Sequence, residues 1–199
     1  MTTEANFYAP PQAKIADPID TAKIAAFYVV SERKFLVLFF ATVGMYTFYW
    51  HWRHWKLHKI DKKLQIWPMP RAVFQMFFAH SLNREIDYLL ERRQQGFNWS
   101  PNALATVFVV FTIISNVAER LSWRGIGSPH SDIVSLLTLL PVGYCMFRSQ
   151  RAANFACGDP EANANRHFTA ANYLWLTLGT LFWALILLGF MLPEDPTAI

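Results

Sequence analysis

Three histidines with helical spacing are the residues of this chain whose types could most readily do chemistry. His51, His54 and His58 lie within residues 49–59, YWHWRHWKLHK. Spacings of three and seven residues place their side chains on one face of an α-helix, and Asp61 falls close to that face. Zinc, copper and iron accept imidazole and carboxylate ligands, so a metal- or haem-linked redox site is one hypothesis for this segment.

A second interpretation makes the same segment the place where a helix leaves a membrane. Four lysines in or just after this segment repel a cation, and three ligands along one straight helix converge poorly on one ion. Tryptophan at headgroup depth, followed by cations that meet lipid phosphates, is typical of such an exit. We therefore favour an interfacial anchor over a metal site, formed by Trp50, Trp52, Arg53, Trp55, Lys56, Lys59, Lys62 and Lys63.

The composition of the whole chain favours the membrane interpretation. Of its 199 residues 53% are hydrophobic and only 16% are charged, whereas soluble domains carry about 25% charged residues. The apolar residues are gathered in blocks long enough to cross a bilayer. We expect an all-α fold, a polytopic α-helical membrane protein with about four transmembrane helices and one amphipathic interfacial helix.

The expected elements follow the apolar blocks along the chain. Residues 1–30 are polar and rich in Pro and Ala, so we expect a flexible tail there. A single transmembrane domain should occupy 31–193, followed by a short C-terminal tail at 194–199. Its spans are expected at about 35–52, 103–121, 133–147 and 173–192, with the interfacial helix at about 70–95.

The first expected span has an alternative. Both of its flanks are basic and Gly44 lies in its middle. It could therefore be a re-entrant hairpin bent at Gly44, which would have to satisfy its backbone polar groups within the protein. If it spans, both termini face outward; if it is re-entrant, the N-terminus lies inside.

Charge distribution gives the orientation. Nine of the 18 Lys and Arg residues fall between Arg53 and Arg93, and three more follow the third expected span. By the positive-inside rule these two loops lie in the cytoplasm. Cys145 and Cys157 form neither a CxxC motif nor a disulfide framework, which favours free thiols in a reducing compartment.

No catalytic motif is present in the sequence: GxSxG, HExxH, P-loop and GxGxxG patterns are all missing. We therefore expect no catalytic residue and no cofactor. The expected spans have no ionisable residue near their centres, although ion-coupled transport usually needs one. Their polar residues are neutral and serve either helix packing or a solute path. Such a path would include Thr112, Asn116 and Thr138 of the spans and Asn154 of the loop after the third span.

Four stretches resemble a group of uncharacterised bacterial inner-membrane proteins. Residues 28–56, YVVSERKFLVLFFATVGMYTFYWHWRHWK, are similar to the start of domains of unknown function of the DUF4234 type. Residues 68–82, the segment around Gln150 and Asn154, and residues 168–189 look like a proteobacterial subgroup. The resemblance implies a multi-pass protein of the bacterial inner membrane. It implies no activity, and its pattern has Phe, Tyr or Asn at His51 and His54.

These observations lead to a ranked expectation for function. The first is a non-enzymatic inner-membrane accessory or scaffold protein, whose partners are anionic lipid headgroups and other membrane proteins or a second copy, but not nucleic acid. The second is a small permease for a neutral or zwitterionic solute. The third is the metal- or haem-linked redox protein suggested by the histidine face.

Overall fold

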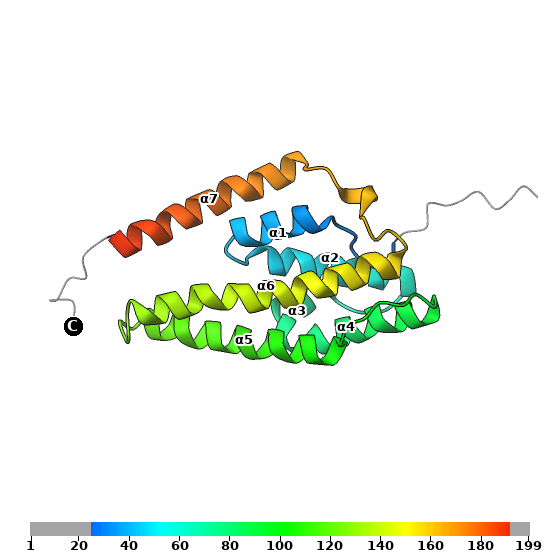
Figure 1. Ribbon diagram of the computed structural model, residues 1–199, viewed down its shortest axis with the longest axis horizontal. Helices are drawn as coiled ribbons and strands as arrows, with labels where there is room; N and C mark the ends of the chain where they lie inside the picture. The colour runs from blue at the N-terminus through cyan, green and yellow to red at the C-terminus, as the bar shows by residue number, and fades with distance from the viewer. Residues whose placement is uncertain (1–24, 192–199) are drawn as a thin grey trace, which may run out of the picture.

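The computed structural model describes residues 25–191, and within that range the chain is helical, without strands (Figure 1). The expected all-α class is therefore confirmed. The elements are α1 (Glu32–Ala41), α2 (Tyr46–Lys62), α3 (Pro68–Val73), α4 (Gln75–Arg92), α5 (Pro101–Ser122), α6 (His130–Cys157), a short 3-10 helix η1 (Asn163–Asn165) and α7 (Ala170–Met191).

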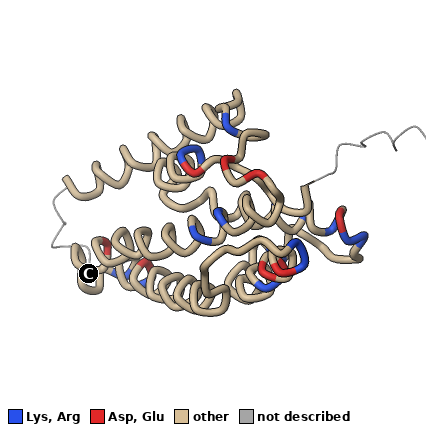
Figure 2. The backbone as a smooth tube through the Cα atoms, turned by 45° about the vertical axis from the view of Figure 1, so that its right-hand side comes forward, with Lys and Arg blue, Asp and Glu red and all other residues tan. Residues whose placement is uncertain are grey.

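Three helices among the described residues are long and apolar enough to cross a membrane, and they are α5, α6 and α7. Long stretches of these helices carry no charged residue (Figure 2). The expected count of four spans is not confirmed. α5 and α7 lie close to the spans expected at 103–121 and 173–192, whereas α6 runs ten residues past the end expected at 147.

The helix expected over 35–52 is wrong as one continuous element. α1 ends at Ala41, and α2 begins at Tyr46 after a turn at residues 42–45. Val43 and Gly44 adopt left-handed backbone angles, with φ of 52° and 81°. Such angles cost a glycine little and end a right-handed helix. The two helices therefore form a hairpin, α1–α2.

Hydrogen bonds within the turn satisfy its backbone. The Thr42 hydroxyl donates to Leu38 O (2.8 Å) and accepts from Tyr46 N (3.0 Å), so it serves the end of α1 and the start of α2. The Gly44 N–H donates to Phe39 O at 2.9 Å. On α7, the Trp183 indole N–H donates to Phe40 O at 2.9 Å. The hairpin thus meets the condition that a backbone excursion into lipid imposes.

The hairpin turn lies beside the midpoints of two long helices. Gly179, halfway along α7, faces the Ala41 carbonyl so closely that an added Cβ would lie 2.1 Å from its oxygen. Gly143, halfway along α6, faces the Phe39 ring, 2.7 Å from such a Cβ. Small residues at these positions allow the close approach. The α1–α2 hairpin therefore extends about half the length of α6 and α7.

Two further boundaries differ from expectation. The interfacial helix expected at 70–95 is divided into α3 and α4 at Phe74. α4 packs along α5, and the Asn83 amide on its buried side donates to Pro101 O at 3.1 Å. Of the tail expected at 1–30, residues 26–30 are buried in the core, while 1–24 and the expected C-terminal tail at 194–199 lie outside the described residues.

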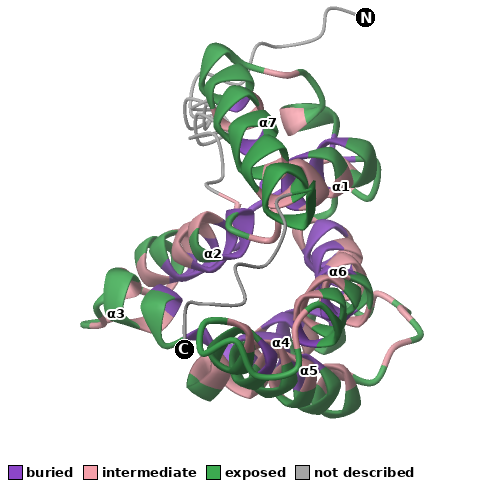
Figure 3. Ribbon diagram, turned by 90° about the vertical axis from the view of Figure 1, so that its left-hand side faces the viewer, coloured by how far each residue is buried: buried purple, intermediate pink, exposed green. Residues whose placement is uncertain are grey.

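The core lies where the hairpin meets α4 and α6. Buried residues concentrate on the inner faces of α1, α2, α4 and α6, whereas α7 is exposed along most of its surface (Figure 3). Apolar side chains exposed on α7 include Leu174, Leu178, Leu181, Leu185 and Leu188. For a helix of this composition, lipid or another protein is the natural neighbour.

Candidate functional site

The three histidines are buried core residues. His51, His54 and His58 share a face of α2 and are 2%, 0% and 2% exposed. His51 Nδ1 lies 3.0 Å from Thr47 O, and His54 Nε2 lies 3.4 Å from Gln150 Oε1. His58 Nε2 lies 3.5 Å from Glu85 Oε2, and its ring stacks on another aromatic ring. The predicted shared face is confirmed, but each imidazole has a different partner.

This arrangement does not support the metal hypothesis. Among residues 25–191 no group of three or more His, Cys, Asp or Glu side chains is placed to hold a metal ion. The three rings follow one another along α2, and Thr47, Gln150 and Glu85 lie at separate points beside them. Burial lowers the pKa of His54 to about 3, with His51 adding to the effect. His54 is therefore neutral at physiological pH.

The expected interfacial anchor divides into two parts. Trp50 and Trp55 are each 1% exposed, so their assignment to a surface belt is wrong. Trp50 Nε1 donates to Gln150 Oε1 at 2.5 Å, which explains why this ring is held inside. The other members remain at the surface or half-buried: Trp52, Arg53, Lys56, Lys59, Lys62 and Lys63.

Cations in this outer part lie over aromatic rings. Arg53 and Lys56 lie over the Trp52 ring, with Lys56 Nζ 4.9 Å from its centre. Lys62 Nζ lies 5.9 Å from the centre of the Tyr88 ring on α4. A cation over an aromatic face is stabilised while part of its charge stays accessible. This side of α2 can therefore meet anionic groups.

A buried amide network fixes the segment 26–30, which sequence reasoning assigned to the tail. Asn154 Nδ2 donates to Val30 O at 3.0 Å, and Val30 N donates to Asn154 Oδ1 at 3.3 Å. Gln150 Nε2 donates to Tyr28 O at 2.9 Å and to Asn154 Oδ1 at 2.6 Å. The two side chains replace the partners that a neighbouring strand would give an extended chain. In the sequence, the one sign that Gln150 and Asn154 act together is their spacing of four residues, which places them on the same face of a helix.

The predicted polar path is not assembled. Thr112 and Thr138 donate to carbonyls of their own helices, Phe108 O and Ser135 O. Asn116 is exposed on α5, and Asn154 belongs to the amide network. None of these four residues lines either of the two large cavities described below. A threonine hydroxyl in an apolar helix commonly donates in this way to a carbonyl one turn earlier in the same helix.

A cavity of about 670 Å³ lies instead between the hairpin turn and the far ends of the long helices. Val43 lines it from the turn, and Ile186 and Phe190 line it from α7. Its polar wall comes from the end of α5, the start of α6 and the loop between them: Glu119, Ser122, Ser128, Asp132 and Ser135. We call it the tip cavity.

Serine hydroxyls hold the two carboxylates of the tip cavity. Glu119 Oε1 accepts from Ser115 (3.1 Å) and Ser135 (3.3 Å). Asp132 accepts from Ser122 through Oδ1 and from Ser128 through Oδ2 (3.0 Å). Neither carboxylate forms an ion pair within the described residues. Two oriented negative charges beside an apolar wall can bind a small organic cation or the ammonium of a zwitterion.

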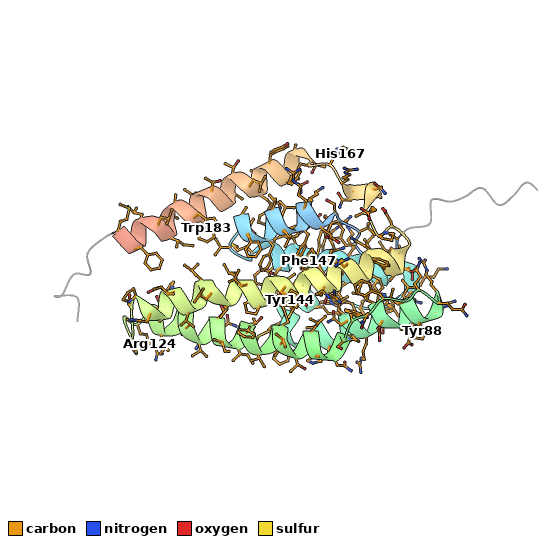
Figure 4. All side chains as sticks on the ribbon, in the orientation of Figure 1. Tyr88, Arg124, Tyr144, Phe147, His167 and Trp183 are labelled. Carbon is orange, nitrogen blue, oxygen red and sulfur yellow. The ribbon has the colours of Figure 1, made fainter. Side chains whose placement is uncertain are left out.

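Figure 4 shows where these features lie along the bundle. Arg124 marks the end with the tip cavity, and Tyr88 and His167 mark the opposite end, near the basic side of α2. Trp183 lies between them, where α7 contacts the hairpin. No family model, curated protein or solved structure matches the chain.

Proposed function

We propose that the chain crosses the membrane three times, through α5, α6 and α7, and that the α1–α2 hairpin is re-entrant. The hairpin turn reaches the midpoints of α6 and α7, and its backbone groups are hydrogen-bonded internally. A polypeptide that enters and leaves a bilayer on one side needs both properties.

Charge supports one orientation of this arrangement. Of the described Lys and Arg residues, Arg120 and Arg124 alone lie in the last turn of α5 or in the loop to α6. The others belong to elements that precede α5 or follow the middle of α6. The positive-inside rule then assigns the Tyr88 end to the cytoplasm and the tip cavity to the outer half of the membrane. In a bacterium this would be the inner membrane.

The function that the geometry supports best is binding of a small cationic or zwitterionic solute in the tip cavity, as the outer site of a small permease. One observation carries this proposal: the cavity reaches from the helix ends to Val43 at half depth, with two serine-bonded carboxylates on its wall. Below Val43, buried Phe35, Leu38 and Phe39 fill the space. The path is closed there, so passage requires the hairpin to move.

Solute binding to the purified full-length protein tests this proposal. Choline, glycine betaine and putrescine are suitable probes, with sucrose as an uncharged reference, and binding is measured by calorimetry. At least one of the three should bind, and Glu119→Gln with Asp132→Asn should weaken binding by about tenfold or more, as expected for lost charge-assisted contacts. Glu161→Gln, an exposed carboxylate away from the cavity, is the control. Binding of none of the probes, or equal binding by the double variant, would contradict the proposal.

The surface side of α2 favours a second candidate function, an accessory or scaffold protein acting through lipid and protein contacts. The observation that favours this function is that Lys56 and Lys62 lie over aromatic rings at the Tyr88 end of the bundle. Charge reversal at Lys56, Lys59, Lys62 and Lys63 should then weaken association with anionic vesicles or with cross-linked partners. Unchanged lipid and partner profiles would count against this candidate.

A further inference from the structure

A second cavity, of about 730 Å³, lies at the opposite end from the tip cavity, between the start of α1 and the segment that leads into α7. Three cations line it: Arg33 and Lys34 from α1, and Arg166 from the segment before α7. We call it the basic cavity. Arg166 is more than 130 positions from Arg33 and Lys34 in the sequence, so the fold brings it to them.

Lys34 is held inside this cavity, and no carboxylate of residues 25–191 forms an ion pair with it. The residue is 2% exposed, and its Nζ donates to Asn165 Oδ1 and to His167 O, both at 2.7 Å. An ammonium group has three N–H donors, so these two bonds leave one available. Burial lowers the pKa of Lys34. An anion beside Nζ would offset this effect because it stabilises the charged form.

The remaining charges leave the basic cavity with a positive balance. Two carboxylates, Glu32 and Glu161, also line it. Glu32 is engaged by Arg151, with 2.9 Å between Oε1 and Nε, so Glu161 alone opposes the three cations. Neither Arg33 nor Arg166 forms an ion pair within the described residues, and both are exposed. Two guanidinium groups and one ammonium suit a phosphate, which Arg binds with two parallel hydrogen bonds.

We propose that the basic cavity binds the phosphate headgroup of an anionic membrane lipid. A lipid fits better than a soluble phosphate because Phe168 and Tyr173 line the same cavity at the start of α7. From Tyr173 onward the exposed side of α7 is apolar, with Leu174, Leu178 and Leu181 open to the surroundings. A headgroup among the cations would place its acyl chains along this surface. This inference does not depend on the solute site at the other end.

Lipid retention by the purified full-length protein tests the proposal. Dioleoylphosphatidylglycerol is the probe, and its binding is measured by native mass spectrometry and by titration in detergent. Arg33→Gln with Arg166→Gln should weaken binding by about tenfold or more, because two charge-assisted contacts are lost. Arg84→Gln with Arg92→Gln removes the same charge from exposed positions of α4, outside the basic cavity, and should leave this binding unchanged.

Three outcomes would overturn the proposal. Equal phosphatidylglycerol binding by the Arg33/Arg166 variant would show that the basic cavity does not hold the lipid. An equal loss in the Arg84/Arg92 variant would assign binding to the general positive field of this end of the bundle. Displacement of the lipid by millimolar inorganic phosphate or glycerol phosphate would make the ligand a soluble phosphate. Thermal unfolding of both variants controls for folding, and choline or betaine binding should not change in either.

Discussion

The carbonyl oxygen of Ala41 lies so close to Gly179 that a Cβ on Gly179 would be 2.1 Å from it. This approach joins the end of α1 to the middle of α7. Trp183, one helical turn further along α7, donates to the neighbouring carbonyl of Phe40 at 2.9 Å. The absence of a side chain at Gly179 and the indole N–H of Trp183 therefore fix how far the hairpin extends along α7.

Gly179→Ala should weaken this contact. The atom in the way belongs to the backbone, so α7 or the end of α1 has to move, and overpacking of this kind typically costs about 1–3 kcal/mol. Thermal unfolding in detergent should show a lower Tm. Gly189→Ala is the matched control on the same helix, because an added Cβ there meets nothing within 4 Å. An unchanged Tm for Gly179→Ala would mean that α7 does not approach the hairpin this closely.

Asn154→Ala should release the segment 26–30 from the core. The substitution removes the amide that pairs with both backbone groups of Val30 and accepts from Gln150. Stability should fall by about 2 kcal/mol, since buried donors and acceptors are left unsatisfied. Hydrogen exchange at Val30 N–H should become about tenfold faster or more. Asn163→Ala removes an exposed amide of η1 and should change neither quantity. Equal hydrogen exchange at Val30 in both variants would contradict this role of Asn154.

Acidification should destabilise the protein through His54. Its folded pKa of about 3 lies below the ordinary value of 6.5, so the unfolded state binds the proton first as pH falls. Stability is therefore fully present above pH 6.5 and should fall by roughly 2 kcal/mol between pH 6.5 and 5 from this group alone. Tm should fall less steeply with falling pH over this range in His54→Phe, where buried His51, whose pKa is lowered to about 4, still contributes. His167→Phe, exposed at the protein surface, should keep the wild-type slope; a parallel slope in His54→Phe would refute the assignment.

The sequence predicts best those elements whose signal is local. The apolar runs of α5 and α7 place both helices within three residues of their observed ends, because composition alone decides them. Gly44 marked the possible bend, but the choice between span and hairpin depends on Gly143, Gly179 and Trp183. These residues are about 100 positions or more away, and nothing local shows that they meet the turn.

The candidate sites were harder to predict for the same reason. The shared face of His51, His54 and His58 follows from their spacing, yet its burial depends on Gln150 of α6 and on the segment 26–30. The basic residues Arg148 and Arg151 suggested the end of the third span. In the fold α6 continues, because these two side chains reach Asn98 O and Glu32. Both cavities are assembled from distant segments, so no motif could reveal them.

Cysteine labelling at the two ends of the helix bundle tests the re-entrant hairpin most directly. Arg33→Cys, Arg124→Cys and Glu161→Cys each provide one exposed thiol, in a chain whose Cys145 and Cys157 are replaced by Ala. A membrane-impermeant maleimide is applied to right-side-out and inside-out vesicles. With a re-entrant hairpin, positions 33 and 161 should label from one side and position 124 from the other. Labelling of positions 33 and 124 from the same side would mean that residues 35–52 cross the membrane, and would contradict the three-crossing arrangement.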